Sequence, residues 1–314
     1  NEAYIFSHTY KEENNLSEIA QLLTVKSFAE YHFKLEGDQQ SQMSDEAYID
    51  LVKTCKKHCQ RGDVFQIVPS KRFSQNFSGD EFNVYRSLRS VNPSPYLFFF
   101  DYGNFKIFGS SPEAQLIVKE GKAEIHPIAG TFKRTGNDEK DAALAKKLSE
   151  DAKENSEHVM LVDLARNDIG RVCDFGSVEV KDLMIIERYS HVMHIVTQVE
   201  DNLTEEHTPY DLIRATFPAG TLSGAPKIRA MQIIEELEPV RRSLYCGSVG
   251  YLGCEGQMDF NIAIRSLVCH EGSIYCWGGG GVVADSELDA EYQETLTKVG
   301  NLLDALQPGH DSYT

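Results

Sequence analysis

Pro127-Ile128-Ala129-Gly130-Thr131 lies between an expected strand at 122–126 and a charged helical segment that begins near Asn137. Taken alone, the stretch is a Gly-Thr turn, and nothing more specific follows from it. Five further segments, one upstream and four downstream, change this interpretation. They are Gly109-Ser-Ser-Pro-Glu113, Asn155-Ser-Glu-His158, Phe217-Pro-Ala-Gly-Thr-Leu-Ser-Gly-Ala-Pro-Lys227, Gly278–Gly281 and Glu291-Tyr-Gln-Glu294. Because the six segments span most of the chain, we interpret them as one set.

The composition is that of an ordinary globular protein. Of its 314 residues, 41% are hydrophobic and 25% are charged, and no apolar run approaches the ~20 residues of a membrane span, so we expect no membrane association. The formal net charge of −17 would repel a phosphate backbone, and no basic patch offsets it, so we expect no nucleic acid partner. An anionic small substrate would need a local cation, either Arg or Lys or a metal.

The seven cysteines favour a reduced, cytoplasmic compartment, since their number is odd and no Cys-x-x-Cys pair occurs. Cys55 and Cys59 are four residues apart on an expected helix, where packing is more common than zinc binding. The N-terminus shows no signal-peptide pattern. It also lacks an initiator Met, which is typical of a fragment or a processed chain.

Three regions are expected along the chain. Residues 1–42 are interpreted as a remnant of an N-terminal region, with a strand at 4–9, a helix at 17–28 and a polar linker at 36–44. A catalytic domain follows at 43–309, and 310–314 form a tail.

Hairpin signals alternate with separate helical segments in the expected domain. Ser44 can cap a helix that Gly62 ends, and two-residue turns at Gly103-Asn104 and Glu120-Gly121 each have strands on both sides. We expect strands at 96–102, 105–108, 114–119, 122–128, 192–199, 247–252, 258–268 and 274–277, and helices at 138–167 with a break, 209–216, 226–237 and 287–306. Hairpins mixed with helices predict an α+β fold with antiparallel sheets.

Two pairs of glutamates recur at a spacing that places each pair on one helix face, Glu154 with Glu157 and Glu291 with Glu294. A solvated acidic face is the ordinary explanation. Against it, the apolar run at 159–164 follows the first pair directly, and a core stripe runs beside the second. Four converging carboxylates would repel one another without a dication, and ligands that are all oxygens favour Mg²⁺.

Other segments also have an ordinary explanation beside the functional one. Gly278–Gly281 is either a bulged strand end or a place where the backbone approaches an anion. The segment 217–227 fails the spacing of a phosphate loop, so we reject nucleotide binding. Arg265, in an alternating strand, either faces the surface or holds a carboxylate with two hydrogen bonds. Glu113 can be a turn cap, and His194 a core histidine.

Taken together, the six segments resemble the chorismate-utilising enzymes, most closely their anthranilate synthase component I group, over roughly 43–306. The resemblance implies the α+β anthranilate-synthase fold, in which helices flank antiparallel sheets and the active site lies between them. It implies chorismate as substrate, Mg²⁺ as cofactor and a glutamine amidotransferase subunit as partner. The implied reaction converts chorismate and ammonia to anthranilate and pyruvate.

The resemblance also implies roles for single residues. Glu113 would protonate the departing hydroxyl and His194 would assist the later elimination, and Gln66 completes the catalytic set. Glu157 and Glu294 would bind Mg²⁺ directly, with Glu154 and Glu291 binding directly or through water. The implied substrate contacts are Gly130, Thr131, Thr221, Tyr245, Arg265, Gly279, Gly280, Gly281 and Lys298.

Two positions separate the branches of this family. Gln66 stands where the water-adding members carry a Lys, and Ala129 stands where aminodeoxychorismate synthases carry a nucleophilic Lys. Both favour anthranilate formation. Pro95 and Tyr96 resemble part of the tryptophan effector site of the family, whose upstream Leu-Leu-Glu-Ser element does not occur in this sequence. Two alternatives stay open, an aminodeoxychorismate synthase and a truncated fragment that only binds a glutaminase subunit.

Overall fold

The computed structural model describes residues 16–25, 32–174, 176–188 and 192–306. The chain divides into two compact units, Asn1–His32 and Phe33–Thr314. The described part of the first unit is helix α1 (Leu16–Thr24), the residue after it and His32. This helix overlaps the one expected at 17–28, whose last residues, like the strand expected at 4–9, lie outside the described residues.

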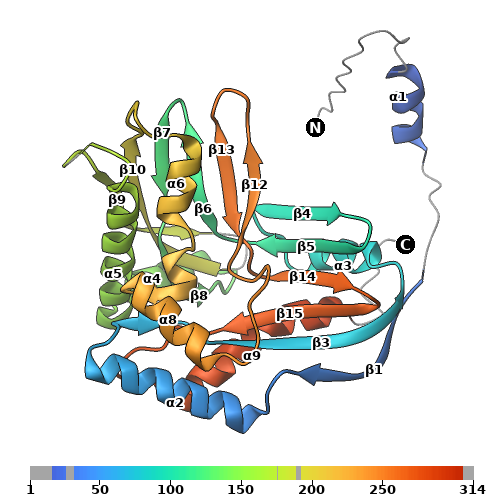
Figure 1. Ribbon diagram of the computed structural model, residues 1–314, viewed down its shortest axis with the longest axis horizontal. Helices are drawn as coiled ribbons and strands as arrows, with labels where there is room; N and C mark the ends of the chain where they lie inside the picture. The colour runs from blue at the N-terminus through green and yellow to red at the C-terminus, as the bar shows by residue number, and fades with distance from the viewer. Residues whose placement is uncertain (1–15, 26–31, 175, 189–191, 307–314) are drawn as a thin grey trace. The chain divides into compact units, whose positions relative to one another are not determined.

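Two large antiparallel sheets form the frame of the second unit (Figure 1). The six-stranded sheet has the order β1 (Phe33–Ser41), β3 (Ser70–Gly79), β15 (Ser273–Gly279), β14 (Ser266–His270), β5 (Phe105–Ser111) and β4 (Tyr96–Asp101). The seven-stranded sheet has the order β12 (Ser248–Leu252), β13 (Met258–Ile262), β6 (Ala114–Lys119), β7 (Lys122–Ile125), β10 (Val192–Asn202) and β8 (Ile128–Lys133), with β9 (Glu179–Arg188) also paired to β10. The strands of the two sheets run in different directions.

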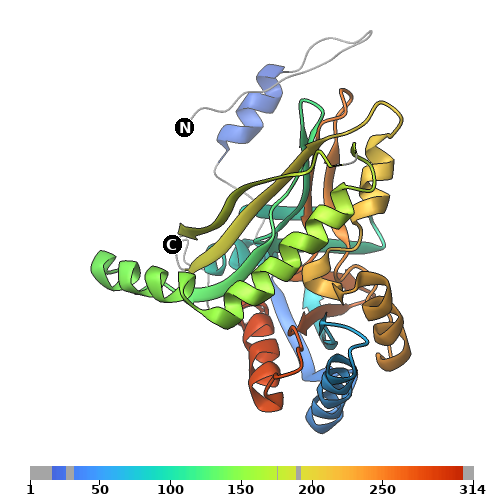
Figure 2. The ribbon, with the colours of Figure 1, turned by 90° about the vertical axis from the view of Figure 1, so that its left-hand side faces the viewer.

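Helices cover both sheets, which confirms the predicted α+β class. They are α2 (Asp45–Arg61), α3 (Phe82–Val91), α4 (Asp138–Ser149), α5 (Ala152–Ile169), α6 (Pro209–Thr216), α7 (Gly220–Ser223), α8 (Lys227–Leu237) and α9 (Leu288–Ala305). Helices α3 and α9 pack on the six-stranded sheet, while α5 runs along β8 and β10 of the other sheet (Figure 2). No helix in the described residues is both long and apolar enough to span a bilayer.

The local signals of helix α2 act as the sequence predicts. The Ser44 hydroxyl accepts a hydrogen bond from the Ala47 amide at 3.2 Å, and Gly62 ends the helix with a φ of 80°. Between these caps, Tyr48 and Val52 are fully buried. They form part of a core that includes residues of α8, so α2 is fixed against the elements that carry the site.

Two expectations about the chain path were wrong. The segment expected as a polar linker at 36–44 is mostly strand β1, which pairs with β3. Polar side chains are typical of an exposed edge strand as well as of a linker, so the composition of this segment does not distinguish the two. The stretch 127–131 is not a turn, because its residues from Ile128 onward belong to β8.

The strand expected at 258–268 is in fact two strands, β13 and β14, in different sheets. Arg265 causes the break, since its φ of 48° is left-handed and cannot continue a strand. A second crossing between the sheets lies beside it, where Pro112 and Glu113 join β5 to β6. The crossings are tied by backbone hydrogen bonds from Ser110 N to Arg265 O, 3.1 Å, and from Ile262 N to Glu113 O, 3.0 Å. Two candidate site residues therefore stand on adjacent crossings.

Candidate active site

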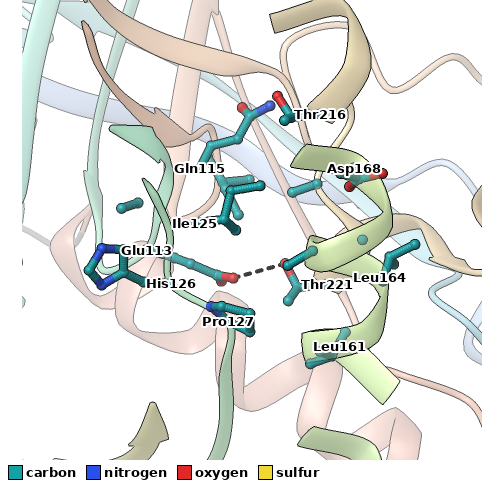
Figure 3. Close-up of a pocket in the computed structure, with 15 residues that line it drawn as sticks. Glu113, Gln115, Ile125, His126, Pro127, Leu161, Leu164, Asp168, Thr216 and Thr221 are labelled. Carbon is teal, nitrogen blue, oxygen red and sulfur yellow. Dashed lines mark hydrogen bonds between the residues drawn. The ribbon is translucent and has the colours of Figure 1, made fainter. Parts of the chain in front are cut away.

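Glu113 is held at its crossing by a single side-chain hydrogen bond among the described contacts. The Thr221 hydroxyl donates to Glu113 Oε1 at 2.9 Å, and Figure 3 shows the two side chains pointing toward each other. Burial raises the pKa of Glu113 to about 7, although Thr221, Lys298 and Arg265 all oppose this shift. A carboxyl with this pKa is protonated in a large fraction of molecules near neutral pH and can act as an acid.

A small cavity of about 40 Å³ lies beside Glu113 and Thr221 (Figure 3). This volume holds a few water-sized molecules at most. Its walls include polar groups of His126, Asp168 and Thr216. Burial raises the pKa of Asp168 to about 6, even though Lys227 Nζ lies 2.6 Å from its carboxylate. Glu113 thus has a small compartment on one side, with mainly apolar walls and a few polar groups.

Arg265 faces the same carboxyl. Its guanidinium lies close enough to Glu113 for their charges to interact, and burial lowers the pKa of Arg265. The expectation that it lies on a strand was wrong, because it sits at the left-handed break between β13 and β14. At this break it is part-buried, in contrast to an ordinary surface arginine. A partly desolvated guanidinium favours binding of a carboxylate.

His194 lies on β10 and reaches the backbone of β8. Its Nδ1 is 2.7 Å from the carbonyl oxygen of Gly130, and because a carbonyl can only accept, Nδ1 carries the proton. Burial lowers the pKa of His194, which favours a neutral ring whose Nε2 is an acceptor. The histidine is therefore suited to take a proton.

Gly130 brings the backbone of β8 against helix α5. Its φ is 62°, and a Cβ at this position would lie 2.7 Å from Leu148 Cδ1 and 3.1 Å from Glu154 Oε2. Glycine is required here both by the left-handed φ and by the close approach. Thr131 follows in the same strand, and its side chain lies outside the described atoms.

The two glutamates of α5 and the two of α9 are near enough for their charges to interact. Burial raises the pKa values of Glu154, Glu157 and Glu291, and repulsion among the carboxylates, including that of Glu294, adds to each shift. Glu291 Oε1 accepts from the Ser286 hydroxyl at 2.7 Å, whereas its buried Oε2 has no hydrogen-bond partner among the described residues.

Nearby lysines hold two of these carboxylates. Lys153 lies 3.8 Å from Glu157, and Lys298 lies 2.7 Å from Glu294. As the side chains stand, no group of three or more His, Cys, Asp or Glu within the described ranges is close enough to bind a metal. The all-oxygen donor set, its mutual repulsion and the orphaned Oε2 of Glu291 nevertheless fit a dication such as Mg²⁺.

The glycine run 278–281 makes close backbone contacts. A Cβ on Gly279 would lie 2.5 Å from Pro69 O and 3.1 Å from the Tyr245 hydroxyl, and one on Gly281 would lie 2.3 Å from Gln66 Nε2. A Cβ on Gly280 would lie 3.2 Å from Glu291 Oε2. This run therefore touches three of the predicted site residues, and any side chain here would displace them.

Gln66 and Lys298 complete the surroundings of this run. The Lys298 ammonium donates to Gly279 O at 3.1 Å. Gln66 is buried on the short strand β2 (Gln66–Ile67), which pairs with β11 (Gly224–Ala225). Within the part of the chain that the structure describes, its Oε1 has no hydrogen-bond partner. A buried acceptor without a donor is a place where a ligand N–H can bind.

A model of the chorismate binding enzymes matches residues 1–304 of the chain. The chain belongs to this family. It is 50% identical over 272 residues to "Anthranilate synthase component 1" of Aquifex aeolicus, which covers 87% of this chain and 55% of that protein. It is 51% identical over 253 residues to the protein of the same name in Pseudomonas aeruginosa, covering 81% and 51%. The chain spans about half the length of these curated relatives.

Solved structures agree on the fold of this chorismate binding enzyme. The crystal structure of anthranilate synthase component I from Streptococcus pneumoniae TIGR4 has a TM-score of 0.82 and 41% identity, covering 91% of this chain and 64% of that one. The menaquinone-specific isochorismate synthase of Escherichia coli has a TM-score of 0.80 at 22% identity, covering 93% and 68%, and so shares the fold.

The predicted effector residues of this chorismate binding enzyme lie apart from the glutamates, at the start of β4. Tyr96 is the first residue of that strand and pairs with Ser111, and Pro95 precedes it. The Ser110 hydroxyl donates to the carbonyl oxygen of Asn92 in the same loop. Since Ser111 leads directly into the Glu113 crossing, this segment is one strand away from the site.

Sequence reasoning missed several residues that line or support the site. Asp168 and His126 line the small cavity, and Glu238 and Arg242 form a buried ion pair behind Thr221 and Tyr245. Helical spacing gives no signal for this pair, because α8 ends at Leu237 and the residues from Glu238 to Arg242 are not helical.

Proposed function

We propose that the chain is the ammonia-using large subunit of an anthranilate synthase, converting chorismate and ammonia to anthranilate, pyruvate and water. The observation that carries this proposal is Glu113, a part-buried carboxyl with a raised pKa that accepts from the Thr221 hydroxyl and interacts with the charge of Arg265. The relatives named anthranilate synthase component 1, about 50% identical, support the same reaction.

Glu113 supplies the proton for the first step. The carboxyl donates to the oxygen at C4 of chorismate, the C4–O bond breaks, and water leaves. Ammonia forms a bond to C2 while the ring double bond shifts toward C4. Thr221 keeps the carboxyl oriented throughout, since its hydroxyl donates to Oε1.

Gln66 discriminates between ammonia and water as the nucleophile. Its unpartnered Oε1 can accept a hydrogen bond from ammonia, which needs no base to attack. A carboxamide cannot remove a proton from water, so hydration of the ring is disfavoured. This selectivity supports the reaction over an isochorismate-forming one.

His194 is placed for the second step. Its acceptor Nε2 can remove the ring proton at C2 as the enolpyruvyl group leaves, and the ring becomes aromatic. The departing group becomes pyruvate. Arg265, Tyr245 and the backbone of 279–281 are proposed to hold the enolpyruvyl carboxylate, which needs a planar cation and exposed N–H groups.

Mg²⁺ is the proposed cofactor, with Glu157 and Glu294 as direct ligands and Glu154 and Glu291 as further ligands, directly or through water. When bound, it would neutralise the ring carboxylate and draw electron density from the ring. Without the dication, the uncompensated negative charge of these four carboxylates would repel other anions from the site.

A separate glutaminase subunit is the proposed source of ammonia. Glutamine hydrolysis needs a nucleophilic thiolate, and burial instead raises the pKa of six cysteines, Cys55, Cys59, Cys173, Cys246, Cys269 and Cys276. The remaining thiol, Cys254, lies in the exposed turn between β12 and β13. The site is proposed to work in the cytoplasm.

The assay for the proposal supplies the purified chain with chorismate, Mg²⁺ and either an ammonium salt or glutamine, with and without tryptophan. We expect anthranilate, identified by mass, with ammonium alone. Inhibition by tryptophan tests the predicted effector role of Pro95 and Tyr96. Aminodeoxychorismate as product would favour the alternative that lacks the elimination step. Robust turnover with glutamine and no partner would contradict the proposed subunit arrangement.

Arg265→Lys is expected to raise the apparent KM for chorismate roughly tenfold or more, since losing a charged hydrogen bond costs about 1.5–3 kcal/mol. Lysine and arginine tolerate the left-handed φ of 48° equally poorly, so the backbone cost cancels. Arg166→Lys on the exposed face of α5 is the matched control. Unchanged kinetics in the Arg265 variant would place this residue outside the substrate site.

A further inference from the structure

The guanidinium of Arg242 binds two backbone carbonyls from distant parts of the chain. Its NH1 donates to Leu222 O at 2.8 Å and its NH2 donates to Val68 O at 2.5 Å. The guanidinium also lies over the ring of Tyr245, 5.7 Å from its centroid. One side chain thereby contacts three segments of the chain. The first follows Gln66, the second follows Thr221 and the third contains Tyr245.

Glu238 binds the same guanidinium and adds a further segment. Its Oε2 accepts from Arg242 Nε at 2.9 Å and its Oε1 from NH2 at 2.6 Å, which makes the pair bidentate. The same Oε1 accepts from the Ser70 amide at 2.8 Å and from the Ser70 hydroxyl at 3.0 Å. Ser70 pairs with Gly279 in the six-stranded sheet, so the glycine run is connected as well.

Each connected segment either contains a predicted site residue or pairs with one. Val68 follows Gln66 by two residues, Leu222 follows Thr221 directly, and Ser70 opposes Gly279. The Val68 amide also donates to Ser223 O at 3.1 Å, which locks the first two segments together. A displacement of the guanidinium would therefore move several site residues at once.

Stability alone is a weak reason for such a pair. The side chains of Arg242 and Glu238 are 16% and 5% exposed. Burying both charges carries a desolvation cost that frequently equals the attraction, and apolar replacements are often no less stable. A bidentate pair does, however, fix geometry to within a narrow range.

We propose that Glu238 and Arg242 are positioning residues of the chorismate site, holding the segments of Gln66, Thr221, Tyr245 and Gly279 in their working arrangement. Neither side chain need touch the substrate. The inference rests on the proposed function, and it adds a supporting ion pair to that site.

Arg242→Lys tests the proposal, because lysine keeps the charge and can pair with Glu238 but cannot reach both carbonyls. We expect kcat/KM for chorismate to fall on the order of a hundredfold, as small displacements of catalytic groups typically cause. Glu238→Gln keeps the volume and is expected to act in the same direction. Glu81→Gln is the matched control, since it removes a similarly buried carboxylate that binds Lys106 far from the site.

A double-mutant cycle separates positioning from general damage. Thr221→Ala should cost activity in the wild-type background but little more in Arg242→Lys, where the Thr221 segment is already displaced, so the two losses fail to multiply. Circular dichroism and thermal melting establish that each variant is folded. Multiplicative losses, unchanged kcat/KM in a folded Arg242→Lys, or failure of both variants to fold would each overturn the proposal. An inactive wild-type chain would instead count against the proposed function.

Discussion

We expect Glu113→Gln to abolish turnover and to leave chorismate binding nearly intact. The carboxamide keeps the volume and can accept the hydrogen bond from Thr221, but it cannot donate an acidic proton to the leaving hydroxyl. Loss of a general acid costs on the order of a hundredfold to ten-thousandfold in kcat. Steady-state kinetics with ammonium, together with a direct binding measurement for chorismate, checks both halves of this expectation.

The pH profile supplies the control for the same residue. As the acid, Glu113 must be protonated, so kcat in the wild-type chain should fall as pH rises through its pKa of about 7. Thr221→Val removes a hydrogen bond that lowers this pKa, and the falling limb should move to higher pH. Near-normal turnover of Glu113→Gln would mean that another group donates the proton. The same conclusion would follow if the falling limb of the pH profile did not move in Thr221→Val.

Removal of Mg²⁺ is expected to stop the reaction, and Glu157→Gln or Glu294→Gln should do the same. Each substitution replaces a charged oxygen ligand by a neutral one with little change in shape, and loss of one charged ligand is severe in a site built from carboxylates. Activity after exhaustive chelation and after adding Mg²⁺ back is the first measurement. Glu235→Gln, on the exposed face of α8, is the control.

A second readout does not depend on turnover. Mg²⁺ that binds the folded chain should raise its melting temperature progressively with Mg²⁺ concentration, and the rise should vanish in the Glu157 and Glu294 variants. It should persist in the Glu235 variant. Full activity without any divalent cation would rule out the metal role.

Local signals in the sequence predicted the hairpins and most helices because their causes are local. The turn at Gly103-Asn104 and the caps at Ser44 and Gly62 need no distant partner, and all three were confirmed. Strand β1 was missed because an exposed edge strand is defined by its partner β3, which lies distant in the sequence. The break at Arg265 was missed because arginine carries no signal for a left-handed φ.

The site residues also divide into those that a local signal predicts and those that depend on the tertiary fold. The spacing of the glutamates predicted two helix faces. That the carboxylates of α5 and α9 come near enough for their charges to interact is a property of the tertiary fold, which the spacing alone does not give. The roles of Arg265 and Gly279 came from resemblance. Arg242 had no such help, because its distant contacts are the backbone carbonyls of Leu222 and Val68, and a carbonyl leaves no trace in residue type.

The adjacent crossings between the sheets restrict how the chain can vary over evolution. Gly109 pairs with Ser266 on one side of the crossings and Ala114 pairs with Asn261 on the other, so both connections are pinned at each end. An inserted or deleted residue in one crossing would shift a strand by one position and turn its side chains to the opposite face. Insertions and deletions can accumulate in loops such as the exposed turn at Cys254, but the lengths of these two connections can change only together.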